Sequence, residues 1–165
     1  MRMFARFVVI GFMLARLLAA GGATALAHEG GNLVVFHSMT PVTGAAVGAF
    51  NDRGIKGGGL PWAITSGSGA VSHKGAVDVT VTGLIVAPLG TNPVTAFKVT
   101  VSCITPGGIV NVSTGTSPAS AAGDSHIQGM VTIPHPCQRP IVFVVSPGGS
   151  WFAMSNLEDE DEDGD

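Results

Sequence analysis

His28 carries the most suggestive chemistry, because the sequence predicts that it becomes a free amino terminus. Residues 7–15 are apolar and follow two arginines, and Ala25-Leu26-Ala27 has the A-x-A form of a cleavage site, so residues 1–27 are typical of a signal peptide. Cleavage after Ala27 would offer the α-amine and the imidazole of His28 to one metal ion. Amine and neutral imidazole nitrogens suit Cu(II) in a tetragonal site. The alternatives are a copper ligand, a terminal histidine that only faces solvent, and cleavage one or two residues away, which would leave no terminal histidine.

A terminal histidine of this kind resembles the metal site of copper-dependent polysaccharide oxygenases and of small copper-binding periplasmic sandwiches. The resemblance implies copper as a cofactor and a second histidine that completes a brace around the metal. Two features depart from it, since the sequence has no tyrosine for an axial position and Gly30-Gly31 follows the new terminus. Four histidines are candidates for the second ligand, and the sequence does not choose among them: His37, His73, His126 and His135.

Cys103 and Cys137 are the two cysteines of a chain that is predicted to be exported. Disulfides persist in oxidising compartments, and two cysteines allow one intramolecular pairing. Their spacing is not C-x-x-C, which argues against a redox or zinc site. We therefore predict a structural disulfide between Cys103 and Cys137.

Asp124, Ser125 and His126 have the side chains of a catalytic triad in consecutive positions. Neighbours on a strand point to opposite faces, so these three cannot form a relay among themselves. The sequence also lacks a G-x-S-x-G elbow, and we interpret Asp124-Ser125 as a turn that enters a strand. Carboxylates outside the tail are too scattered to indicate a glycosidase pair: Glu29, Asp52, Asp78 and Asp124. No catalytic residue is predicted, and the sequence leans against an enzyme.

Three further segments have simpler interpretations than a ligand site. Gly57-Gly58-Gly59 lacks the Lys-Ser/Thr of a phosphate loop, so it predicts a flexible or tightly turning loop. Residues 158–165 hold seven carboxylates without the spacing of a calcium loop and predict a disordered, solubilising tail. Asn111-Val112-Ser113 is a glycosylation sequon that matters where the host glycosylates exported proteins.

The charge balance excludes one class of partner. Without residues 1–27 the chain has five basic and eleven acidic residues, a formal net charge of −6, and the body before the tail is nearly neutral. The absence of a basic patch argues against nucleic-acid binding. No second apolar stretch is long enough to span a membrane, so we expect no membrane span in the mature chain.

Short strands must position all of these residues. The sequence is rich in Gly, Val and Thr, and residues 76–82 alternate strictly, with Val77, Val79 and Val81 on one face. Residues 94–104 repeat the pattern and place Cys103 toward the core. The other predicted strands are 33–37, 109–112, 126–133, 141–145 and 150–154.

Turn residues separate these strands. Ser72–Gly75 predicts a four-residue hairpin turn, and two Pro-Gly-Gly segments at 105–108 and 146–149 predict type II turns in which the first glycine takes a positive φ. Residues 134–137 (PHPC) predict a stiff, extended connection. We therefore predict an all-β fold of about eight or nine strands, an antiparallel β-sandwich or jelly-roll-like single domain over residues 28–157.

Four stretches resemble a group of uncharacterised secreted microbial proteins: Val99–Gly108 (VTVSCITPGG), Gly123–Gln128 (GDSHIQ), Thr132–Cys137 (TIPHPC) and Pro140–Ala153 (PIVFVVSPGGSWFA). The resemblance extends over roughly Gly54 to Met154. It implies one secreted β-rich domain and carries no activity.

We expect a secreted, extracellular or periplasmic, non-catalytic protein that binds an unknown extracellular ligand or surface. A binding role predicts an exposed aromatic or apolar patch, which we place near Trp62, Trp151 or Phe152. The alternative function is a copper-binding protein or oxidase that uses His28.

Overall fold

The alternation of apolar and polar residues builds the first of two main sheets. The structure is a computed structural model that describes residues 31–156, so the predicted signal peptide, His28 and the acidic tail lie outside the described residues. The first sheet is antiparallel, in the order β1-β4-β5-β10. Its strands are β1 (Asn32–Phe36), β4 (Ser66–Ser72), β5 (Ala76–Thr82) and β10 (Ser125–Met130).

The second sheet contains six strands in the order β2-β12-β11-β7-β8, with β9 paired to β7. Its strands are β2 (Met39–Pro41), β7 (Ala96–Thr105), β8 (Gly108–Ser113), β9 (Ser117–Pro118), β11 (Gln138–Val145) and β12 (Trp151–Ser155). A small third sheet pairs β3 (Trp62–Ala63) with β6 (Ile85–Val86), and a 3-10 turn, η1, covers Gly44–Ala46. The all-β antiparallel prediction is confirmed, and the eight strands of five or more residues account for the expected number.

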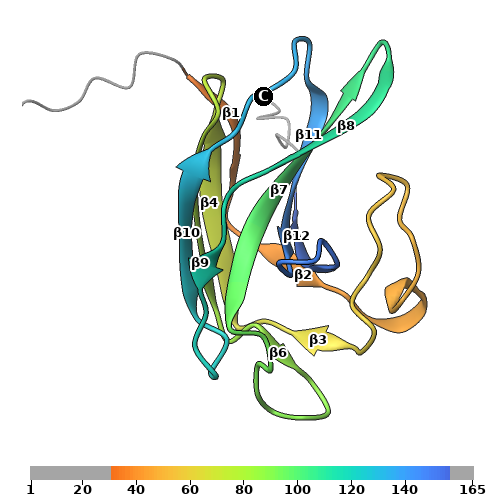
Figure 1. Ribbon diagram of the computed structural model, residues 1–165, viewed down its shortest axis with the longest axis vertical. Coiled ribbons are helices and arrows are strands. Elements are labelled where there is room, and N and C mark those ends of the chain that lie inside the picture. Colours follow the sequence, from red (N-terminus) through yellow and green to blue (C-terminus); the bar gives the residue numbers. More distant parts are fainter. Residues whose placement is uncertain (1–30, 157–165) are drawn as a thin grey trace, which may run out of the picture.

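The two main sheets lie side by side and pack their apolar faces together, as in a β-sandwich (Figure 1). Val79 and Val81 of β5 and Ile127 of β10 are fully buried from one side. Phe97, Val99 and Val101 of β7 are fully buried from the other. The chain crosses from one sheet to the other between β1 and β2, so β1 belongs to the four-stranded sheet and β2 to the six-stranded sheet.

All three predicted hairpin turns are at the predicted positions, but the two Pro-Gly-Gly turns are of another type. The hairpin at Ser72–Gly75 is confirmed, since Gly75 donates its N–H to the Ser72 carbonyl at 2.9 Å. In the two Pro-Gly-Gly turns the positive φ falls on the second glycine, at 113° for Gly108 and 95° for Gly149. The type II prediction is therefore wrong. The geometry fits a type I turn followed by a left-handed glycine, which suits a hairpin.

The segment before β11 also differs from expectation. Residues 134–137 bend instead of running extended, and the peptide bond between His135 and Pro136 is cis. The predicted disulfide is present: Cys103 of β7 is bonded to Cys137, with 4.9 Å between their Cα atoms. Among residues 31–156 no helix is long and apolar enough to cross a membrane.

Candidate binding site

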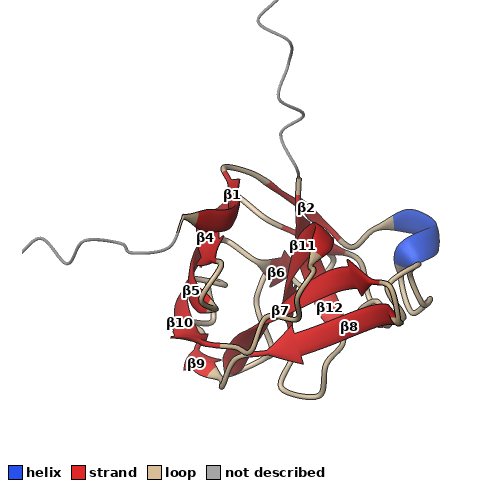
Figure 2. Ribbon diagram, turned by 90° about the horizontal axis from the view of Figure 1, so that it is seen from above, coloured by secondary structure: helices blue, strands red, loops and turns tan. Residues whose placement is uncertain are grey.

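A long connection covers the outer face of the six-stranded sheet. Segment 42–61 leaves β2, crosses the face that points away from the four-stranded sheet and returns to β3 (Figure 2). Thr100 and Ser102 of β7 point to this face, and both are buried, with exposed fractions of 5% and 0%. The polar face of β7 is therefore covered by protein, which the alternation in its sequence does not predict.

Segment 42–61 is held by specific contacts, as a connection of this length must be if it is ordered. The side-chain oxygen of Asn51 accepts hydrogen bonds from the backbone N–H of Arg53 at 3.0 Å and of Ile55 at 2.9 Å. A Cβ at Gly57 would lie 2.1 Å from the Ala46 carbonyl oxygen, and one at Gly58 would lie 2.9 Å from Nε1 of Trp62. The glycine run therefore permits close packing, which supports the tightly turning interpretation.

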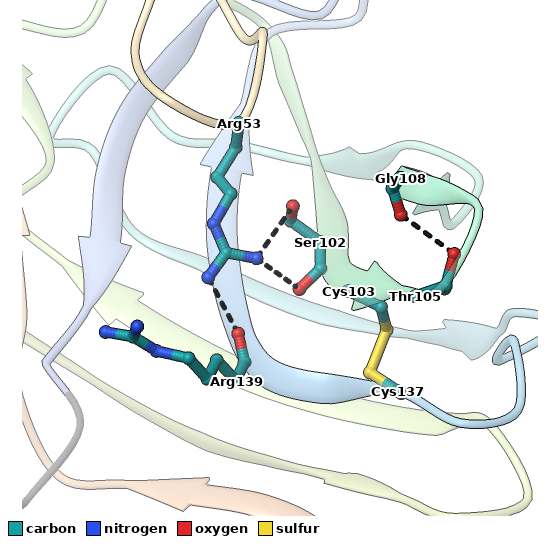
Figure 3. Close-up of a disulfide and its surroundings, with 7 residues drawn as sticks. All are labelled: Arg53, Ser102, Cys103, Thr105, Gly108, Cys137 and Arg139. Atoms are coloured by element: carbon teal, nitrogen blue, oxygen red, sulfur yellow. Dashed lines mark hydrogen bonds between the residues drawn. A yellow bond between two sulfur atoms is a disulfide. The ribbon is translucent and has the colours of Figure 1, made fainter.

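Arg53 fastens this segment to the sheet (Figure 3). Its guanidinium donates to the Arg139 carbonyl at 2.8 Å and, in longer contacts of 3.4 and 3.5 Å, to the hydroxyl and carbonyl of Ser102. Burial of the guanidinium, and secondarily the positive charge of Arg139, lowers the pKa of Arg53. Arg53 is 9% exposed, and no carboxylate accepts a hydrogen bond from it within the described chain. Arg53 therefore fastens the segment to the sheet through two backbone carbonyls and one hydroxyl.

A hollow of about 280 Å³ lies between segment 42–61 and strands β11 and β12. Its apolar wall is formed by Ala46, Ile141, Phe143, Trp151 and Met154, and its polar side by Asn51, Asp52 and Arg53. The rings of Phe143 and Trp151 meet edge to face, with 5.9 Å between their centroids.

Two residues that line this hollow each have a buried donor without an acceptor. Nδ2 of Asn51 and Nε1 of Trp151 are buried nitrogen atoms with no hydrogen-bond partner among residues 31–156. An unpaired buried donor costs about 1–3 kcal/mol, and most buried polar groups avoid this cost. Here both unpaired donors belong to residues that line the same hollow. An apolar hollow with a few polar groups is expected of a site for a small ligand.

A second, open groove lies on the other side of segment 42–61, toward β7 and β8. Phe50, which is 72% exposed, lines it together with Lys56, Asn111 and Ser113. The aromatic patch predicted from sequence is not there. Trp62, Trp151 and Phe152 are buried, with exposed fractions of 3–5%, because Trp62 stacks on Phe152 at 3.8 Å and Trp151 packs on β11.

The triad-like residues are separated, as their positions on the strand predict. Ser125 is buried and its hydroxyl donates to the Pro118 carbonyl at 2.8 Å, while His126 is exposed on the opposite face. Asp124 accepts the Gly83 N–H at 2.9 Å and closes a turn. His126 instead lies 2.8 Å from Asp78 of β5, and no hydroxyl in the described chain is hydrogen-bonded to it.

Asp78 gives the protein a predicted response to acid. A hydrogen bond from Gln128 lowers the pKa of its carboxyl most, and a hydrogen bond from His126 lowers it further. A carboxyl whose pKa is lowered by folding stabilises the protein above its unfolded pKa of about 3.9, and this stabilisation is lost as the pH falls through the folded value. We expect Asp78→Asn to reduce the loss of unfolding free energy between about pH 5 and pH 2, measured by urea titration. An unchanged pH profile would contradict this, and Asp52→Asn is the matched control.

The metal ligands predicted from sequence remain a prediction. His28, the predicted copper ligand, lies outside the described residues, as does Glu29, one of the carboxylates considered for a glycosidase pair. In residues 31–156 no three His, Cys, Asp or Glu side chains are grouped closely enough to hold a metal ion. Of the four possible partner histidines, His126 is engaged with Asp78, and His73 and His135 line one hollow.

The sequon asparagine has a structural partner. Nδ2 of Asn111, the atom to which a glycan would be attached, donates to the Arg53 carbonyl at 2.8 Å. We expect Asn111→Ala to lower the free energy of unfolding by about 1 kcal/mol, because one hydrogen bond to segment 42–61 is lost. Thermal unfolding measures this, with Thr116→Ala at an exposed position as the control. Equal midpoints for the two variants would refute the structural role.

Comparison with known proteins adds no relative: no protein-family model, curated protein or solved structure matches the chain. The resemblance to secreted microbial proteins therefore stays a prediction. The hollow beneath segment 42–61 was not predicted from sequence either. Its one available signal is the length of the connection between β2 and β3, which is unusual for a segment with little regular structure.

Proposed function

We propose that this chain is a non-catalytic binding module of the cell exterior that holds a small, ring-sized ligand beneath segment 42–61. The pair of unpartnered donors, Asn51 Nδ2 and Trp151 Nε1, carries the proposal, because both residues line one hollow that has an apolar wall and a polar side. A ligand with an apolar ring and a carbonyl or hydroxyl oxygen would pack on Phe143 and Trp151 and accept a hydrogen bond at the same wall.

Two further observations support this role. The Cys103–Cys137 disulfide is typical of proteins from oxidising compartments, such as the extracellular space or the periplasm. Arg53 and Asn51 hold the segment above the hollow through hydrogen bonds, which fixes the position of the segment over strands β11 and β12.

The test uses the two tryptophans, which differ in their surroundings. Trp151 lines the hollow, and Trp62 stacks on Phe152 in the core. We expect titration with benzamide, benzoate or methyl glucoside to shift the indole N–H resonance of Trp151 and to leave that of Trp62 in place. Trp151→Phe removes the donor and keeps a ring, and Trp62→Phe assigns the second resonance.

The expected effect of Trp151→Phe is a roughly tenfold weaker affinity for the best probe, which corresponds to one hydrogen bond of about 1.4 kcal/mol. Trp62→Phe should bind that probe as the wild-type protein does. Equal affinities for the two variants, or no shift of the Trp151 resonance with any of the three probes, would overturn the proposed site.

A further inference from the structure

A second hollow forms where the hairpin between β4 and β5 meets the chain that leaves β10. Both lie at one end of the four-stranded sheet (Figure 1). The Gly75 carbonyl accepts the Val131 N–H at 2.9 Å. Gly75 has a φ of 90°, and a Cβ there would lie 1.8 Å from the Val131 carbonyl oxygen, so only glycine permits this approach. The hairpin and residues 130–135 are therefore held together by backbone contact.

Three residues with soft or borderline metal-binding donors line the hollow between these segments, which measures about 530 Å³. His73 comes from the hairpin, Met130 from the end of β10 and His135 from the bend that follows. All three are exposed, and Met130 is 66% exposed. A methionine left open to solvent at the end of a strand is not needed for packing, which leaves its thioether free for a ligand.

We propose that His73, Met130 and His135 form a binding site for monovalent copper. Thioether sulfur is a soft donor that favours Cu(I), and imidazole nitrogen binds copper readily. No carboxylate lines the hollow, so it lacks the oxygen donors that calcium and magnesium require. Lys74 also lines it, and its positive charge disfavours a divalent ion more than a monovalent one.

The backbone on both sides limits how far these donors can move. The His73 N–H donates to the Gly31 carbonyl at 3.1 Å, which ties the hairpin to the residue before β1. On the other side His135 lies between two prolines, and Ile133, which is 6% exposed, anchors the segment in the core. The three proposed donors therefore all lie between residues 73 and 135, on segments fixed by the framework.

The experiment measures Cu(I) affinity by competition with bicinchoninate in ascorbate, using the processed full-length protein carrying His28→Ala. That substitution removes copper binding by a terminal histidine. We expect His73→Asn, His135→Asn and Met130→Leu each to weaken Cu(I) binding at least about tenfold, since even the loss of an outer-sphere partner costs roughly 10- to 100-fold. His37→Asn, at an exposed histidine in the turn between β1 and β2, is the matched control and should bind as its parent does.

Zn(II) provides the second readout, because it does not favour a thioether. Met130→Leu should weaken Cu(I) binding and leave Zn(II) affinity unchanged, which a merely structural defect would not do. The proposal is overturned if the His28→Ala protein fails to compete with the chelator. It is also overturned if the three site variants bind Cu(I) as tightly as His37→Asn does.

Discussion

Replacing both cysteines, as Cys103→Ala with Cys137→Ala, should lower the free energy of unfolding by about 3–4 kcal/mol. The disulfide joins residues 34 apart in sequence, and the chain-entropy model assigns this magnitude to a loop of that length. Chemical denaturation of the oxidised wild type and of the double variant measures the difference. Because domains are typically stable by about 5–15 kcal/mol, a loss of this size shifts the denaturation midpoint clearly.

The same change should reach the hollow beneath segment 42–61. Cys103 follows Ser102, and Cys137 precedes Arg139 by two residues, so the disulfide lies beside both residues that accept hydrogen bonds from Arg53 (Figure 3). We expect the double variant to bind the best ring probe more weakly even where it remains folded. Wild-type protein treated with a strong thiol reductant is the control that keeps both side chains. Unchanged stability in both samples would refute the structural role of the disulfide.

Phe97→Ala should cost about 3–5 kcal/mol, because removal of a buried aromatic ring loses its transfer free energy and leaves a cavity. Phe97 is 0% exposed and meets both Trp62 and Phe152 edge to face, at 6.4 and 5.9 Å between centroids. This aromatic cluster joins β7 to β12 and to the start of β3. Thermal and urea unfolding both measure the loss.

Phe50→Ala is the matched control, since the same side chain is there 72% exposed. Its effect on stability should stay within about 0.5 kcal/mol, as for most surface substitutions. A comparable loss in the two variants would show that the exposed ring of Phe50 is a packing residue after all. A small loss in Phe97→Ala would show that the aromatic cluster does not carry the core.

Local patterns predicted most of the framework. The alternation of Val77, Val79 and Val81 is sufficient to place β5, because the period of two and the burial of one face follow from strand geometry. The disulfide followed from the number of cysteines and the expected compartment. These features depend on neighbours in sequence or on chemistry that allows one pairing.

The candidate site depends on contacts between distant residues, and these were not predicted. Asn51 and Trp151 belong to one hollow because segment 42–61 folds back over the sheet, which no periodic pattern indicates. For the same reason Trp62 and Trp151 were expected at the surface although both are buried. The two histidines that line the second hollow, His73 and His135, are brought to it because β5 pairs with β10.

The connection between β2 and β3 has a consequence for engineering. Its two ends meet, since the Trp62 N–H donates to the Val42 carbonyl at 2.9 Å, and both flanking residues are buried in the framework. Because the two ends of the segment are adjacent, a segment of another sequence can replace it without changing the distance between β2 and β3. Libraries that vary this segment outside Asn51, Arg53 and the glycines should yield folded proteins with new specificities on an unchanged sandwich.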